Sequence, residues 1–292
     1  MQHPAEKTAF WQLQVCVFLW GFTAILGRLI TLPATSLVLW RMGLAAALLA
    51  LLPRVWRGMR RLDSRALRRH AFAGCVIALH WLAFYAAIKL ANASVAVACL
   101  AVAPVFAAII EPIVTQQAYR RSQLTLGLLA VPGVWLLIGG VPTNMQQGIL
   151  AGIVAAVLTA TFASINKRYS DPEAEPASIT VLQLGVGALF LFFFGGWTFG
   201  KDAVIVVPDT TDLVWLLVLA VACTIVPFLL WLRALHYVSA FTTQLSLNLE
   251  PVYAITLAAF IFSEHAELTP RFYLGVVVIL ATVLLQPRIA RD

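Results

Sequence analysis

The sequence is dominated by blocks of apolar residues, each about 17 to 25 residues long and separated by short polar segments. A helix of this length rises about 1.5 Å per residue and so crosses the roughly 30 Å of hydrocarbon in a bilayer. Charged residues make up 11% of the chain and hydrophobic residues 61%, which leaves too little polar surface to cover a water-soluble globule. The apolar residues do not alternate with polar ones at period two, which excludes a barrel of spanning strands. We therefore predict an all-α membrane protein.

Ten blocks are long enough to form transmembrane helices. They are expected at Thr8–Ile30, Ser36–Pro53, Ala71–Leu90, Ala93–Thr115, Leu124–Gly140, Gly148–Asn166, Ala177–Trp197, Leu213–Leu235, Ala240–Phe262 and Phe272–Gln286. The first block is long, contains polar and aromatic residues and lacks a small-residue cleavage site before Arg28. We interpret it as a helix that remains in the protein, and not as a signal peptide.

The basic residues that give the chain its net charge of +7 lie mostly between the predicted helices. The loop between the second and third helices holds seven arginines: Arg54, Arg57, Arg60, Arg61, Arg65, Arg68 and Arg69. If the N-terminus is cytoplasmic, most Lys and Arg residues fall on the cytoplasmic side, so the positive-inside rule places both termini there. This explanation accounts for the charge without a nucleic-acid partner. A lipid-binding or regulatory role of the arginine loop is a second interpretation.

An internal repeat relates the two halves of the chain. The segment Phe84–Ile110 aligns without gaps with Trp231–Leu257 after a shift of 147 residues. Six positions are identical, at Ala87, Ala93, Leu100, Pro104, Val105 and Ala107 of the first copy. Five spans in each copy is an odd number, so the second copy enters the membrane from the opposite side. We predict two inverted five-helix repeats, residues 1–140 and 141–292, around a central cavity.

Several short motifs carry a family resemblance over nearly the whole chain. They are Leu19-Trp20-Gly21-Phe22, Trp40-Arg41, Ala103-Pro104-Val105-Phe106, Leu249-Glu250-Pro251-Val252, and the tail from Phe260 through Glu264 and Leu268 to Gly275. On these residues the sequence resembles the drug/metabolite transporter superfamily, specifically proteins with two EamA-type repeats. Within it, the chain looks most like the YddG-like exporters of aromatic and other amino acids. It departs from many relatives at Gln116-Gln117, where they carry a glutamate followed by a basic residue.

The resemblance implies a secondary transporter or facilitator that exports small organic solutes by alternating access. The expected cargo is amino acids, aromatic ones included, and the expected location is a bacterial inner membrane, as a monomer or homodimer. Drugs, nucleosides or other metabolites are alternative cargoes on the same fold, and a membrane receptor or intramembrane enzyme is a more remote alternative. An inverted repeat around a midplane cavity serves alternating access directly, which favours transport over the last two.

No cofactor, metal or catalytic residue is expected. The chain lacks the phosphate-binding loop, the dinucleotide fingerprint, the zinc-binding helix motif and the nucleophile elbow. Its four cysteines lie inside apolar blocks without C-x-x-C spacing, which is typical of small buried side chains. They are Cys16, Cys75, Cys99 and Cys223.

Polar residues in the middle of spans are the candidate transport residues, since they are unfavourable in lipid unless they face a cavity or a partner. Glu250 lies near the centre of the ninth span, before Pro251. It is a candidate for binding a substrate ammonium group or for proton coupling, and equally for a carboxyl group satisfied inside the bundle. Gln244 and Asn248 are four residues apart and share one helical face, where amides either contact substrate or join helices.

His80 lies midway along the third span, among aromatic residues at helical spacing. It is a candidate for substrate binding or coupling, or for a neutral imidazole bonded to a neighbouring helix. Trp81, Phe84 and Tyr85 form an aromatic wall in the same span, facing either the cavity or lipid.

Further candidates come from other spans. Trp20 in the first span either packs between helices or lines the cavity, and Tyr253 in the ninth is predicted to line it. Arg41 either faces the cavity or reaches toward headgroups. Prolines within spans create kinks that serve as hinges or as static bends. The hinge candidates are Pro104, Pro227 and Pro251.

Overall fold

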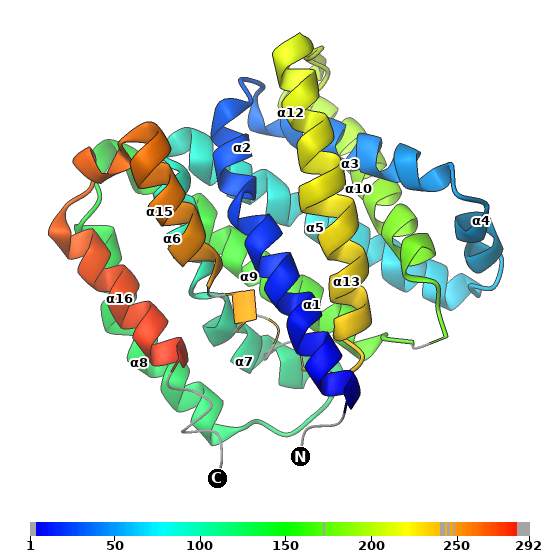
Figure 1. Cartoon of the computed structure of the whole chain (residues 1–292), viewed down its shortest axis with the longest axis horizontal. Helices are drawn as coiled ribbons and strands as arrows, with labels where there is room; N and C mark the ends of the chain where they lie inside the picture. Colours follow the sequence, from blue (N-terminus) through cyan, green and yellow to red (C-terminus); the bar gives the residue numbers. More distant parts are fainter. Residues whose placement is uncertain (1–3, 172, 240–242, 244–245, 248, 285–292) are drawn as a thin grey trace.

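The computed structural model describes residues 4–171, 173–239, 243, 246–247 and 249–284, and in this part every regular element is a helix (Figure 1). The α-helices are α1 (Pro4–Gly21), α2 (Thr23–Leu29), α3 (Ala34–Ala50), α4 (Pro53–Met59), α5 (Ser64–Leu90), α6 (Ala93–Leu100), α7 (Ala103–Thr115), α8 (Arg121–Gly139), α9 (Gln146–Arg168), α10 (Pro176–Thr198), α11 (Lys201–Val204), α12 (Thr210–Ala220), α13 (Val226–Ala234), α15 (Glu250–Phe262) and α16 (Pro270–Leu284). A π-helix at Val221–Ile225 joins α12 to α13, and 3₁₀ turns occur at Thr143–Met145 and Glu264–Ala266.

Six spans in the described residues are long and apolar enough to cross a membrane. They are Thr8–Leu29, Ser64–Leu90, Ala93–Thr115, Thr143–Arg168, Pro176–Thr198 and Thr210–Ala234. A seventh is added if α3 and α4, which meet at 95°, count as one span, while α15 and α16 are apolar but shorter. The prediction of an all-helical membrane protein is therefore confirmed for the described residues, whereas the number of ten spans is not.

Three of the spans predicted as single helices are divided. The helix of the first span is interrupted at Phe22, between α1 and α2. That of the fourth span is interrupted at residues 101–102, between α6 and α7. In the eighth span the α-helix is interrupted by the π-helix between α12 and α13. Each hinge candidate lies in the first turn of a helix: Pro104 in α7, Pro227 in α13 and Pro251 in α15. The first two of these helices begin where a predicted span is interrupted. Proline lacks the N–H that would continue a helix from the preceding turn, so it is tolerated at these starts.

The backbone repeats at the same shift as the sequence. Helices α7 and α15 each have 13 residues, and both their first and last residues are 147 positions apart. Each helix is followed by a residue in the left-handed region, Gln116 with φ 59° and Ser263 with φ 55°, and these are the non-glycine residues with positive φ among those described. Two helices of equal length with the same unusual end at corresponding positions are the structural counterpart of a two-repeat architecture.

Helix α5 lies at the centre of the bundle and packs against α9 and α10, while α8 and α16 pair at one side (Figure 1). Its approach to α10 is close, because a Cβ atom at Gly74 would lie 2.4 Å from the backbone oxygen of Gln183. At Gly185, on α10, an added Cβ would meet nothing within 4 Å.

These two glycines make a matched pair for a stability test. Gly74→Ala is expected to lower the free energy of unfolding by about 1 to 3 kcal/mol, because the backbone of α10 has to move away. Gly185→Ala should be neutral or stabilising by about 0.5 to 1 kcal/mol, since alanine favours the helix. Thermal unfolding of the purified variants in detergent measures both. Equal melting temperatures for the two variants would contradict the close packing of α5 on α10.

Candidate substrate cavity

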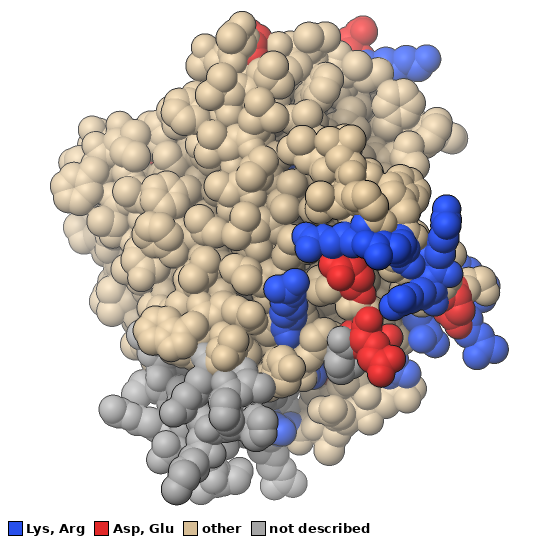
Figure 2. Space-filling view, turned by 45° about the vertical axis from the view of Figure 1, so that its right-hand side comes forward, with Lys and Arg blue, Asp and Glu red and all other residues tan. Residues whose placement is uncertain are grey.

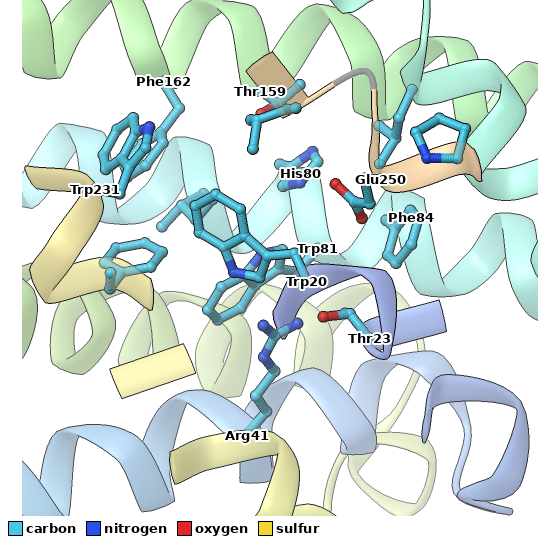
Figure 3. A pocket seen from close by; sticks show the side chains of 15 residues that line it. Trp20, Thr23, Arg41, His80, Trp81, Phe84, Thr159, Phe162, Trp231 and Glu250 are labelled. Atoms are coloured by element: carbon cyan, nitrogen blue, oxygen red, sulfur yellow. The ribbon is translucent and has the colours of Figure 1, made fainter. Parts of the chain in front are cut away.

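A cavity lies between the two repeats, enclosed by α1, α2, α3, α5, α6, α9, α13 and α15 (Figure 3). Its lining is mostly aromatic, with a few polar side chains. The lining residues are Trp20, Thr23, Arg41, Ile77, His80, Trp81, Phe84, Leu100, Thr159, Phe162, Phe228, Trp231, Leu247, Glu250 and Pro251. Concave, mainly apolar sites with a small number of polar groups are typical of small-molecule binding.

Arg41 is the cation of this cavity, and its side chain is held from three directions. The guanidinium donates to Thr224 Oγ1 at 2.7 Å, to Tyr85 Oη at 2.8 Å and to the carbonyl oxygen of Cys223 at 3.0 Å. Its Cζ lies 3.7 Å from the ring centroid of Trp81, which is a cation–π contact. The residue is only 1% exposed, and these neutral acceptors and the aromatic face take the place of water around its charge. A planar guanidinium with five donors suits this arrangement, and two N–H groups remain for a ligand.

The π-helix at Val221–Ile225 supplies two of these acceptors. Thr224 accepts from Arg41 and donates its own hydroxyl to Leu219 O at 2.8 Å. Widening the helix at this turn leaves the carbonyl of Cys223 available to the guanidinium. π-Helical turns are frequent at functional sites, and here the turn supplies two of the acceptors that hold Arg41 at the cavity wall.

Glu250 and His80 bring further polar groups to the same space. Both side chains are buried, and both line the cavity shown in Figure 3. His80 Nδ1 lies 2.8 Å from Ala155 O on α9. A carbonyl oxygen only accepts, so Nδ1 is the protonated nitrogen in this contact and Nε2 is left for a ligand. Glu250 begins α15, where the positive end of the helix dipole favours a carboxylate.

The aromatic walls follow the internal repeat. In the repeat alignment, with its shift of 147 residues, Trp81 corresponds to Phe228 and Phe84 corresponds to Trp231. All four side chains line the cavity. Trp81 and Phe228 meet edge to face, with ring centroids 5.9 Å apart. Each repeat therefore contributes an aromatic pair from the corresponding helix, α5 or α13.

Trp231 also offers a hydrogen-bond donor. Its ring stacks on Phe162, with centroids 5.4 Å apart and an interplanar angle of 11°. The side chain is 3% exposed, and its Nε1 has no hydrogen-bond partner among the described residues. Buried N–H groups are almost always paired, so this indole is available to an acceptor on a ligand.

The structure brings most of the candidate residues together and leaves some apart. His80, Trp20, Trp81, Phe84, Arg41, Glu250 and Pro251 line the cavity. Tyr85 is fully buried behind it, where it accepts from Arg41, so its part in the site is support. Tyr253 is outside the lining and 42% exposed, because its Cβ packs beside Gly21 and its ring meets Phe18. Gln244 and Asn248 fall outside the described residues.

Comparisons with known proteins identify the family and the fold. The model of the EamA-like transporter family matches residues 8–139 and, a second time, residues 146–286. The chain belongs to this family. An uncharacterized transporter of Archaeoglobus fulgidus is 27% identical to this EamA transporter over 239 residues, 81% of each protein. A solved crystal structure has the same fold, with a TM-score of 0.68 and 16% identity over 98% of both chains.

One end of the EamA bundle is held together by a buried carboxylate. Glu264 is fully buried and forms an ion pair with Arg28 of α2. The same carboxylate accepts from the backbone N–H groups of Ala93 and Ser94, at 3.1 and 2.8 Å, in the first turn of α6. Glu267 adds a second contact to Arg28 at 3.7 Å. Helices α2 and α6 and the turn after α15 are thus joined at what we call the Glu264 end.

Besides the aliphatic Ile77, Leu100 and Leu247, five lining residues of the transporter were not among the sequence candidates. They are Thr23, Thr159, Phe162, Phe228 and Trp231. The repeat alignment contains the signal for two of them, since shifting the aromatic stripe of the third span by 147 residues gives Phe228 and Trp231. The other three lie in apolar segments without a distinguishing pattern.

Proposed function

We propose that this EamA transporter exports amino acids, including aromatic ones, as the resemblance to YddG-like exporters suggests. The observation that carries the proposal is the presence of a guanidinium and a carboxylate in one aromatic cavity. Figure 3 shows Arg41 and Glu250 reaching toward the same space from two sides, with Trp20 and Trp81 between them. A zwitterion presents its carboxylate to Arg41 and its ammonium group to Glu250, and a substrate ring packs on the aromatic walls.

Transport proceeds in this proposal by alternating access of two inverted repeats. The cavity takes matching helices from both halves, and the interrupted fourth and eighth spans give the helices places to bend near Pro104 and Pro227. Pro251, in the first turn of α15, is the third proposed hinge. With both termini in the cytoplasm of a bacterial cell, the arginine loop is cytoplasmic and the Glu264 end faces outward. The contacts of Glu264 then hold the outer end closed, and release of substrate requires them to break.

Glu250 provides the test of cargo and coupling. Glu250→Gln is expected to lower saturable flux of labelled phenylalanine into liposomes by about 30-fold, equivalent to losing about 2 kcal/mol of charge-assisted binding. The measurement uses purified protein, phenylalanine, threonine and a nucleoside, each with and without an imposed pH gradient. A gradient effect that disappears in Glu250→Gln indicates proton exchange, and no effect in either protein indicates facilitated diffusion.

A matched control neutralises a carboxylate far from the cavity. Glu173 is exposed on the segment after α9, and Glu173→Gln should transport like the unmodified protein. If only the nucleoside is transported, the amino-acid assignment is wrong and the aromatic walls serve a planar base. If correctly folded protein transports none of these solutes, the result would favour a membrane receptor or an intramembrane enzyme over a transporter.

A further inference from the structure

The arginine-rich segment that connects α3 to α5 contains a short helix, α4, with a defined orientation. Helix α4 turns away from α3 at 95°, so it runs across the direction of a predicted spanning helix. Figure 1 shows it at the edge of the bundle, where α3 ends and α5 begins. A helix that lies across the spanning direction, next to the end of a spanning helix, is in the position of an interfacial helix.

One face of α4 is fixed to the protein. Val55 is fully buried in a small apolar cluster with Leu49, Ala177 and Val181. The hydroxyl of Ser178, at the start of α10, donates to Val55 O at 2.7 Å. These contacts set which side of α4 turns inward and therefore which side chains remain outside.

The outer face of α4 carries an aromatic ring between two cations. Arg54, Trp56 and Arg57 are exposed, and Trp56 retains 52% of its surface. The indole Nε1 donates to Ala50 O at 2.8 Å, which holds the ring at the end of α3. Tryptophan beside arginine is the combination expected at the boundary between hydrocarbon and headgroups.

Five more exposed arginines extend this surface into the following loop and the start of α5. They are Arg60, Arg61, Arg65, Arg68 and Arg69. Residues 54–69 contain these seven arginines and one acid, Asp63, so the segment has a net charge of +6. Figure 2 shows basic side chains gathered on one side of the molecule, with a few acidic ones among them.

The acidic side chains near this surface do not form ion pairs with its arginines in the described part of the chain. Asp63 is engaged as the N-cap of α5, accepting from the N–H of Ala66 at 2.7 Å. The ion pairs within 4 Å among the described residues all involve Arg28, so none of the seven arginines has a carboxylate partner there. Arg69 instead lies over the ring of Tyr169, with Cζ 4.4 Å from the centroid.

We propose that α4 and the following arginines form a binding surface for anionic phospholipid headgroups, such as phosphatidylglycerol, with Trp56 at the interface. Orientation in the membrane requires only that positive charge lies in this loop. It does not require a helix fixed across the spanning direction, with an exposed tryptophan between arginines. Guanidinium groups bind phosphate oxygens with paired N–H donors, and basic clusters beside a spanning helix attract anionic lipids. The proposal is independent of the cargo.

Fluorescence quenching in lipid nanodiscs tests this surface. The purified protein is placed in phosphatidylcholine nanodiscs containing an equal small fraction of brominated phosphatidylglycerol or brominated phosphatidylcholine. The signal of Trp56 is the difference between the unmodified protein and Trp56→Phe. We expect this signal to be quenched several-fold more by the anionic lipid, and the excess to decrease in high salt. Both faces of a nanodisc are open, so membrane orientation does not affect the result.

Three variants separate charge from folding. Replacing Arg54, Arg57, Arg60 and Arg61 together with glutamine should remove the excess quenching, while lysine at the same positions should retain most of it. Lys201→Gln, at an exposed site on α11, should leave it unchanged. Equal quenching by the two brominated lipids in the unmodified protein would overturn the proposal. Displacement of the anionic lipid by millimolar glycerol phosphate would also overturn it, since that indicates a phosphate site and not a lipid surface.

Discussion

Arg41→Lys is expected to lower the free energy of unfolding by about 3 kcal/mol and to abolish transport, although lysine keeps the positive charge. The guanidinium joins α3 to α5 through Tyr85 and to the π-helix through Thr224 and Cys223. A single ammonium group cannot reach all three acceptors while stacking on Trp81. The unmatched acceptors would then be buried without donors.

Thermal unfolding in detergent and amino-acid flux in liposomes measure the two effects separately. Tyr85→Phe is the graded control, because it removes one acceptor and keeps the ring. It should reduce stability by about 1 kcal/mol and leave measurable transport. Should Arg41→Lys unfold and transport like the unmodified protein, Arg41 would be a peripheral cation and the proposed carboxylate site would lose its support.

Glu264→Gln is expected to open the Glu264 end. The carboxylate accepts from two N–H groups of α6 and from Arg28, and glutamine retains one acceptor oxygen and no charge. The side chain of Arg28 is 30% exposed, so solvent screens the ion pair and the buried backbone contacts carry most of the effect. Losing about 2 kcal/mol from the closed state increases the open population by about 30-fold.

Thiol labelling follows this change. A single cysteine at Thr23, in a background without the four native cysteines, reports access to the cavity from the Glu264 end. Its reaction with a membrane-impermeant maleimide should accelerate by about 10-fold or more in Glu264→Gln. Glu267→Gln neutralises the outer, half-exposed carboxylate and should change the rate little. Identical rates in all three proteins would show that these contacts do not close the bundle.

Sequence patterns anticipated part of the cavity. His80, Arg41 and Glu250 stood out because a polar residue deep in an apolar span needs a partner or a cavity. The aromatic residues were harder to predict, since a helix in a membrane bundle is apolar on every side and has no polar face to mark the outside. Tyr253 therefore had the same sequence signal as Trp81, although only Trp81 lines the cavity.

The interruptions of the spans were also not visible in the sequence. A proline marks the start of α7 and of α13, yet prolines occur inside membrane helices as well, as Pro112 does in α7. The change at Phe22 has no proline, and the π-helix has no sequence signature. An interruption frees backbone N–H and C=O groups, and it is stable only where neighbouring helices supply hydrogen-bond partners for them, as Arg41 does for the carbonyl oxygen of Cys223.

The sequence by itself determined that the chain forms membrane helices and that its two halves are copies. The reason is local: in hydrocarbon every backbone group has to be bonded within its own segment, so apolar length alone specifies a helix. Tertiary structure decided which side chains meet. Arg28 and Glu264 are 236 residues apart, and Arg41 and Thr224 are 183 apart. Such pairs follow from the packing of helices that look alike from outside, and no local pattern encodes them.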